Sequence, residues 1–270
     1  MISGFPIKQN KSIDPQVSNE CPTTLVRFDF KAVIEQISPL PAYSLLIGVC
    51  EDGTPLILDL RNYSSGSILL VGDNQFGNQQ LLRSMLLSAC KLNNEQDINI
   101  HLVTPKVRSY PELVHQPHFV QAFYGRDMAS WILVEEFVRL GRERQKGMKV
   151  YPMQIFAVEE IDLLLQDFEK DLLKQFQWLL EVGPEVNIWV TATLSTDHIS
   201  GELSPLLKSF RTQIFGRIES PGVSAQFAGE PFLDLREKIP GVDCTVRAGG
   251  EDIKVFIPQF EDKVNPLSKE

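Results

Sequence analysis

Apolar residues along this chain form short continuous runs that alternate with segments in which they recur every three or four positions. The runs have the length of strands and cover Tyr43–Cys50, Pro55–Leu60, Ser67–Val71, Ile98–Thr104, Met153–Val158, Val186–Ala192 and Gln213–Ile218. The periodic segments have helical spacing and cover Asn78–Leu92, Asp127–Lys146, Phe168–Leu180 and Leu203–Phe210. Strands that alternate with helices predict an α/β fold, in which a mostly parallel sheet carries helices on both faces.

Shorter signals add detail between these segments. An Asp-Gly pair, Asp52-Gly53, separates the first two runs and predicts a β-hairpin in front of the parallel sheet. Leu25–Ile37 predicts a strand followed by a short helix, and Gly241–Ile257 predicts a closing β region. Residues 105–126 are interrupted by prolines and predict irregular structure.

The two ends of the chain differ from its middle. Residues 1–24 are polar, contain three prolines and predict a flexible N-terminal arm. Residues 261–270 predict a polar tail. Residues 25–260 contain no internal repeat and no low-complexity block, so we expect a single domain there.

The run Ser67–Val71 leads into two glycines five residues apart and then into a helical segment. Strand, glycine-bounded loop and helix are the layout of a phosphate-binding P-loop, G-x-x-x-x-G-K-[ST]. In this layout the residues that would contact a nucleotide are Gly72, Asp73, Asn74, Gln75, Phe76, Gly77, Asn78 and Gln79. The sequence therefore has the frame of a nucleotide-binding loop.

The side chains that a P-loop uses for its chemistry are replaced. Its lysine contacts the β- and γ-phosphates and its hydroxyl ligates magnesium, but these positions hold Asn78 and Gln79. Hydrogen bonds to charged groups contribute roughly 1.5–3 kcal/mol, against about 1 kcal/mol for neutral ones. Asp73 adds negative charge near the place where phosphates would lie. We expect no cofactor, or weak binding of ATP or ADP, with magnesium binding left undecided.

Composition limits the cellular compartments and the partners that we expect for the protein. A net charge of −9 and a pI near 5.1 disfavour a wholly basic nucleic-acid binder but leave a local basic patch open. Four scattered cysteines without a C-x-x-C pair predict neither a zinc site nor a disulfide framework. No apolar run approaches the roughly 18 residues of a membrane helix, and the N-terminus has no signal-peptide layout. We expect a cytoplasmic protein without a membrane segment.

The order of the segments resembles the FtsK/HerA family of P-loop motor ATPases, also called FtsK/SpoIIIE-type, over roughly residues 43–258. The segments that match this family's motifs are, in order, Ile47–Leu60, Ser67–Met85, Gln154–Glu160, Val186–Thr193, Thr212–Ile218 and Ser224–Gly229. No segment is specific alone, so the signal lies in their order and spacing. The resemblance implies a P-loop NTPase fold of RecA/ASCE type and rings that act on double-stranded DNA. A related branch of the family drives protein export and contains degenerate nucleotide domains, so the resemblance also allows that role.

At the family's second motif the resemblance gives catalytic roles to two carboxylates. Glu159 stands where an acid orients magnesium, and Glu160 stands where an acid activates water. Glutamate in place of aspartate lengthens the arm by one carbon and disturbs a tight octahedral site. The alternative is that both carboxylates cap the following helix, where negative charge suits the positive end of the helix dipole. The sequence leaves both interpretations open.

The family's other polar positions are also replaced. Leu194 and Ser195 stand where the family has glutamine and arginine, and Gln213 and Ala225 stand where it has two arginines that can reach a neighbouring subunit. Arg211 and Arg217 lie near these positions and are candidates to compensate across a subunit interface. Because one absent charge donor typically costs about 100- to 1,000-fold in rate, several together predict little turnover.

Two further groups of residues have both a functional and a purely structural interpretation. A basic cluster at the end of the long helix is either a DNA-contacting patch or a solvated helix terminus, and it contains Arg139, Arg142, Arg144, Lys146 and Lys149. His115 and His118 lie three residues apart, but they flank Pro117 in a polar loop, which favours loop residues over metal ligands.

These observations support two hypotheses of different classes. In the first, the chain is a non-hydrolysing FtsK/HerA-like domain that serves as a binding or assembly subunit, in a homo-oligomer or in a hetero-oligomer with paralogous ATPase subunits. Its partner is DNA or protein, and the acidic charge leans toward protein. In the second, the chain is an active ATP-dependent double-stranded DNA translocase with a divergent loop. A nucleotide-sensing switch that binds without turnover is a weaker third option.

Overall fold

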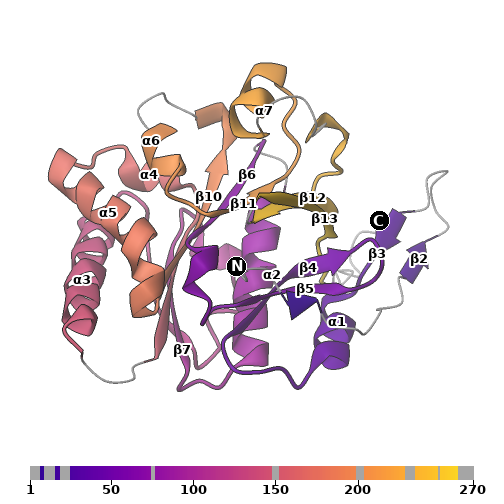
Figure 1. The fold of residues 1–270 in the computed structure, drawn as a ribbon, viewed down its shortest axis with the longest axis horizontal. Helices are drawn as coiled ribbons and strands as arrows, with labels where there is room; N and C mark the ends of the chain where they lie inside the picture. The colour runs from indigo at the N-terminus through magenta and orange to yellow at the C-terminus, as the bar shows by residue number, and fades with distance from the viewer. Residues whose placement is uncertain are drawn as a thin grey trace, which may run out of the picture.

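The computed structural model describes residues 7–8, 16–18, 25–73, 77–147, 152–198, 204–228, 235–248 and 250–260. Within these ranges eleven strands form one mixed sheet (Figure 1). Their order across the sheet is β1 (Ile7–Lys8), β5 (Pro55–Asp59), β4 (Ser44–Cys50), β13 (Glu251–Phe256), β12 (Asp243–Ala248), β11 (Thr212–Phe215), β6 (Ile68–Gly72), β10 (Ile188–Ser195), β9 (Met153–Val158), β7 (Ile98–Val103) and β8 (Phe119–Phe123).

The sheet has a parallel part and an antiparallel part. Neighbouring strands run parallel from β11 through β6, β10, β9 and β7 to β8. The hairpin of β4 and β5 pairs antiparallel with β13, which continues through β12 to β11. The parallel strands with a hairpin in front of them are therefore confirmed. Because parallel strands share one carboxyl edge, the loops after β6, β7, β9 and β10 meet at that edge.

Two layers of helices cover the sheet. The first layer is α1 (Phe30–Ile37) and α2 (Asn78–Leu92), and the second contains α3 (Met128–Gln145), α4 (Ile161–Leu165), α5 (Lys170–Val182), α6 (Ser204–Leu207) and α7 (Pro221–Ala228). Figure 1 shows α2 and α3 on opposite sides of the sheet. Alternate residues of β6 serve the two cores: Ile68 and Leu70 pack with the first layer, and Leu69 and Val71 pack with the second.

Most predicted elements lie where the sequence placed them, and the helix Asn78–Leu92 has the same bounds. The prediction that residues 105–126 are irregular is wrong at β8. This strand lies at the outer edge of the sheet, and Val120 is an extra residue in its pairing with β7, so its apolar pattern is broken. Within the predicted N-terminal arm the structure describes β1 and also β2 (Gln16–Ser18), which pairs with β3 (Leu25–Arg27). The predicted tail lies outside the described residues.

A chain of polar side chains crosses the second core beside α3. His101 is buried, and its Nδ1 accepts a hydrogen bond from Gln121 at 3.2 Å, while its Nε2–H donates to Gln154 Oε1 at 3.0 Å. The Phe137 ring stands edge-on to the imidazole. Burial lowers the pKa of His101 from its ordinary 6.5, because the low-dielectric surroundings disfavour the charged imidazolium.

This arrangement predicts a pH dependence of stability. Unfolded His101 takes up a proton near pH 6.5, whereas folded His101 resists it until the pH reaches its lowered pKa. Stability is therefore full above pH 6.5 and falls as the pH drops from there toward the lowered value. Denaturant titrations at pH 7.5 and 5.5 should show this loss in the native protein and a smaller one in His101→Gln. The exposed His115→Gln control should behave like the native protein. An equal loss in His101→Gln would contradict the assignment.

Candidate functional site

The predicted loop connects β6 to α2 at the carboxyl edge of the parallel strands. Gly72 ends β6, and Gly77 precedes α2 with φ +91°, a left-handed conformation that favours glycine. A Cβ at Gly77 would lie 2.8 Å from the Cα of Gly241, so two backbones touch there. The predicted site residues Asn74, Gln75 and Phe76 lie outside the described residues.

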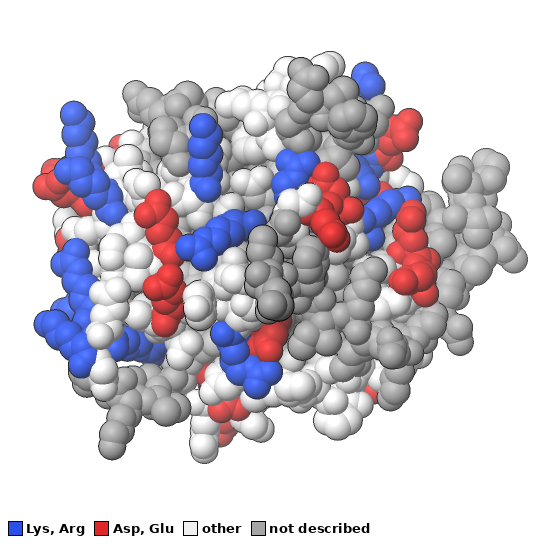
Figure 2. All heavy atoms as spheres, in the orientation of Figure 1, with Lys and Arg blue, Asp and Glu red and all other residues white. Residues whose placement is uncertain are grey.

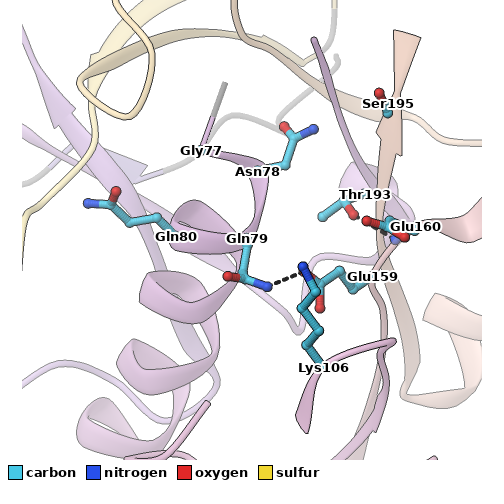
Figure 3. A pocket seen from close by; sticks show the side chains of 9 residues that line it. All are labelled: Gly77, Asn78, Gln79, Gln80, Lys106, Glu159, Glu160, Thr193 and Ser195. Atoms are coloured by element: carbon cyan, nitrogen blue, oxygen red, sulfur yellow. Dashed lines mark hydrogen bonds between the residues drawn. The ribbon is translucent and has the colours of Figure 1, made fainter. Parts of the chain in front are cut away.

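The two substituted positions on α2 point in different directions (Figure 3). Gln79 reaches across to β9, where its Nε2 donates a hydrogen bond to Glu159 Oε1 at 2.5 Å. Asn78 faces β10, and its Nδ2 lies 3.4 Å from the carbonyl oxygen of Leu194. The Oδ1 atom of Asn78 is buried and has no hydrogen-bond partner among the described residues. Neither side chain brings a positive charge to the loop.

Glu159 directly follows β9 and is only 5% exposed. Its Oε1 accepts from Gln79, and its Oε2 accepts from the hydroxyl of Thr104 at the end of β7. The pKa of the neighbouring Tyr110 phenol lies well above its ordinary value, because the ring is buried and the charge of Glu159 is close. Neutral donors from two elements, Gln79 on α2 and Thr104 after β7, therefore hold this carboxylate.

Glu160 has an unusual backbone for a glutamate. Its φ of +56° lies in the left-handed region, which costs a non-glycine residue roughly 1–2 kcal/mol. Its N–H donates to Thr193 Oγ1 at 2.9 Å, which fixes the turn against β10. The Glu160 side chain makes no capping hydrogen bond to α4. The geometry at Glu160 therefore does not support the alternative interpretation, in which this carboxylate caps the following helix.

These elements enclose a cavity of about 330 Å³ at the carboxyl edge of the sheet. Figure 3 shows the residues that line it: Gly77, Asn78, Gln79, Gln80, Lys106, Glu159, Glu160, Thr193 and Ser195. Its wall carries two carboxylates and one lysine. The predicted glycine, amide and carboxylate positions are thus brought together around one hollow.

The sequence analysis did not name Gln80, Thr193 or Lys106 as site residues, and Lys106 is the charged one of the three. It follows β7, and in Figure 3 its side chain extends toward Gln79 and Glu159. A signal was available, because the end of any parallel strand near the P-loop strand delivers its next residues to the same edge. The lysine of this site therefore follows β7, whereas a P-loop lysine would stand at the start of α2.

Other predicted residues lie outside the cavity wall. Asp73 turns to the loops after β10 and β11, where it accepts from the Thr196 hydroxyl and from the Glu219 N–H at 2.9 Å. Arg217 lies at the same edge and pairs with Glu219 at 2.7 Å. Arg211 precedes β11 and packs on Gly66, at the opposite edge of the sheet. Arg211 therefore cannot supply the missing charge to the loop of its own chain.

The basic cluster at the C-terminal end of α3 is largely engaged by its own chain. Arg144 donates to the carbonyl oxygens of Val186, Asn187 and Pro152, and Arg139 pairs with Glu143. Figure 2 shows positive side chains gathered at the lower left of this face and positive and negative side chains mixed over the rest of it. Arg142 lies over the Trp178 ring, and the predicted Lys149 is outside the described residues. This arrangement fits the helix-end interpretation better than a patch for DNA.

The donor set does not fit a magnesium ion held between α2 and β9. Magnesium requires oxygen ligands in a near-octahedral shell. The residue at the hydroxyl position, Gln79, instead points its N–H group at Glu159, and a hydrogen-bond donor cannot ligate a cation. Where the structure is described, no group of three or more His, Cys, Asp or Glu residues could hold a metal ion. His118 bonds the carbonyl of Asn93, which fits a loop residue.

No protein-family model and no curated protein matches the chain. Solved structures match its fold. EccC of Thermomonospora curvata (ATPases 2 and 3, in complex with a signal sequence peptide) has a TM-score of 0.67 and 13% identity, covering 84% of this chain and 43% of that one. EssC of Geobacillus thermodenitrificans (ATPases 2 and 3) has a TM-score of 0.68 and 14% identity, covering 94% and 49%. The pCW3 conjugation coupling protein TcpA, in monomer form with ATPγS, has a TM-score of 0.66 and 15% identity, covering 90% and 72%.

These similarities confirm the predicted fold, a mostly parallel sheet with helices, which the chain shares with parts of EccC, EssC and TcpA. The chain spans less than half of the EccC and EssC chains that it matches. In the described part of the chain, no helix is both long and apolar enough to cross a membrane.

Proposed function

We propose that this chain is a P-loop ATPase-like domain that does not hydrolyse ATP and serves as a binding or assembly subunit. The observation that carries the proposal is the hydrogen bond from Gln79 Nε2 to Glu159 Oε1. In a P-loop enzyme the corresponding hydroxyl and acid share a magnesium ion between them. Here the amide itself spans that gap, so the acid is satisfied without a metal.

The charges around the cavity support weak nucleotide binding at most. Lys106 is the lining cation, and Glu159 and Glu160 are the lining carboxylates. A polyphosphate without magnesium would meet more negative than positive charge, and at short range in a partly buried site this repulsion is costly. The first-turn N–H groups of α2 can still donate to an anion. The cofactor that we propose is therefore none, or ATP or ADP held weakly and without magnesium.

A protein partner fits the surface better than DNA. The solved EccC and EssC structures each carry two ATPase units, and EccC was solved with a signal sequence peptide. Assembly with related ATPase units is the corresponding role for this chain. Phosphate contacts to DNA need available cations, whereas Arg139, Arg142 and Arg144 contact groups of their own chain.

The proposal is tested by measuring binding and turnover of ATP together. Calorimetry of the native protein with magnesium and ATP should detect no binding tighter than about 1 mM, near −4 kcal/mol. A turnover assay should stay at background, with and without a DNA duplex. Glu160→Gln provides the control, because it should leave a background rate unchanged. Micromolar binding with turnover that duplex DNA stimulates and Glu160→Gln abolishes would overturn the proposal and support a DNA translocase.

A further inference from the structure

A polar stripe runs along the first turns of α2, although this helix is otherwise mostly buried. Gly77, Gln80 and Arg83 are spaced by three residues and therefore lie on one side of the helix. The residues between them, Leu81 and Leu82, are fully buried in the apolar core. Polar residues on this side need hydrogen-bond or charge partners, and residues 257–260 supply them.

The partner is residues 257–260, which we call the strap. Gln80 Nε2 donates to Gln259 Oε1 at 2.6 Å. The guanidinium of Arg83 lies 4.5 Å from the centre of the Phe260 ring, in a cation–π contact. At the third position, Gly77 touches Gly241, whose carbonyl accepts a hydrogen bond from Gln259 Nε2 at 2.6 Å.

The strap is itself anchored to the first helical layer. The N–H of Gln259 donates to the Phe28 carbonyl, and the Gln259 carbonyl accepts from the N–H of Phe30, both at 2.8 Å. The rings of Phe30 and Phe260 lie 4.7 Å apart. The strap therefore joins α1 to the start of α2 and holds a defined position there.

Arg83 carries the connection on to the other wall of the cavity. Besides lying over Phe260, Arg83 forms an ion pair with Glu112. Glu112 belongs to the segment that follows β7, which also carries Lys106 and the buried Tyr110. The strap thus contacts the α2 wall through Gln80 and reaches the Lys106 wall through Arg83.

We propose that the strap is a conformational device that sets the position of both cavity walls, so that docking of the strap and occupancy of the cavity are energetically coupled. A ligand or partner side chain that moves Gln80 or Lys106 would loosen the strap, and undocking the strap would loosen the walls by the same free energy. The proposal does not depend on whether the cavity takes a nucleotide. It makes the strap the place from which a partner could open the site.

Hydrogen exchange on the full chain tests this coupling. Phe260→Leu and Gln259→Ala each remove one strap contact and keep the chain intact. Each should speed exchange roughly 5- to 30-fold at amides of residues 78–83 and 106–112, the change that corresponds to losing one or two kcal/mol locally. Phe168→Leu is the matched control, because Phe168 is a partly buried ring in the opposite core.

The pattern of exchange decides the outcome. Faster exchange at the two walls, beyond that at the strap and its direct contacts, in both strap variants and with no such change in Phe168→Leu, supports the coupling. Unchanged exchange at the walls overturns it. A uniform increase along the whole chain, equal to that in Phe168→Leu, also overturns it, because it reports only a lower global stability.

Discussion

Replacing Asn78 by Lys and Gln79 by Ser in one variant should raise the affinity for magnesium–ATP by at least about 100-fold. Lysine adds the missing charge, and serine adds the missing hydroxyl while removing the amide that now bonds Glu159. Two hydrogen bonds to charged groups contribute roughly 1.5–3 kcal/mol each, and every 1.4 kcal/mol is a factor of ten. Isothermal titration calorimetry measures the change.

The two single variants are the controls for this gain. Asn78→Lys alone should bind more weakly than the double variant, because Gln79 still bonds Glu159. Gln79→Ser alone should stay near the native value, since no charge is added. If the double variant binds no better than the native protein, the cavity does not have the shape of a nucleotide site. Replacement of the lysine and the hydroxyl residue would then not be what prevents ATP binding.

Gly77→Ala should lower the free energy of unfolding by roughly 3 kcal/mol. A Cβ in a left-handed conformation costs roughly 1–2 kcal/mol, and φ here is +91°. The same Cβ would lie 2.8 Å from the Gly241 backbone, and overpacking typically costs about 1–3 kcal/mol more. Chemical denaturation of the native and variant proteins gives the difference.

Gly147→Ala separates the two contributions. Gly147 has φ +89°, nearly the same as Gly77, but no atom of the described residues lies within 4 Å of a Cβ placed there. This control should cost only the conformational part, roughly 1–2 kcal/mol. Equal losses in the two variants would mean that the turn at Gly241 yields freely and that its contact with α2 contributes nothing.

Local patterns predicted the frame of the site well. The frame consists of the apolar run of β6, the glycines Gly72 and Gly77, and the helical period of α2. These features lie next to one another in the sequence, so their structure depends on residues that are close along the chain. Strand β8 was missed because an edge strand buries little and because Val120 interrupts its alternation. Periodicity detects burial, and it fails where burial is partial.

The contacts that decide the chemistry could not be predicted in the same way. Gln79 and Glu159 are 80 residues apart, and only the register of α2 against β9 brings the amide to the carboxylate. Asp73 was expected to face phosphates, yet its carboxylate is taken up by Thr196 and Glu219. Side-chain direction depends on partners from distant segments, which composition and spacing do not specify.

The irregular pairing of β8 has a consequence for how copies of this protein can associate. An open sheet edge is a template on which another strand can add, and long flat edges lead to aggregation. In β8 the extra residue Val120 breaks the regular spacing of backbone donors and acceptors along this edge. This edge of the sheet is therefore a poor template for a strand added from another copy of the protein.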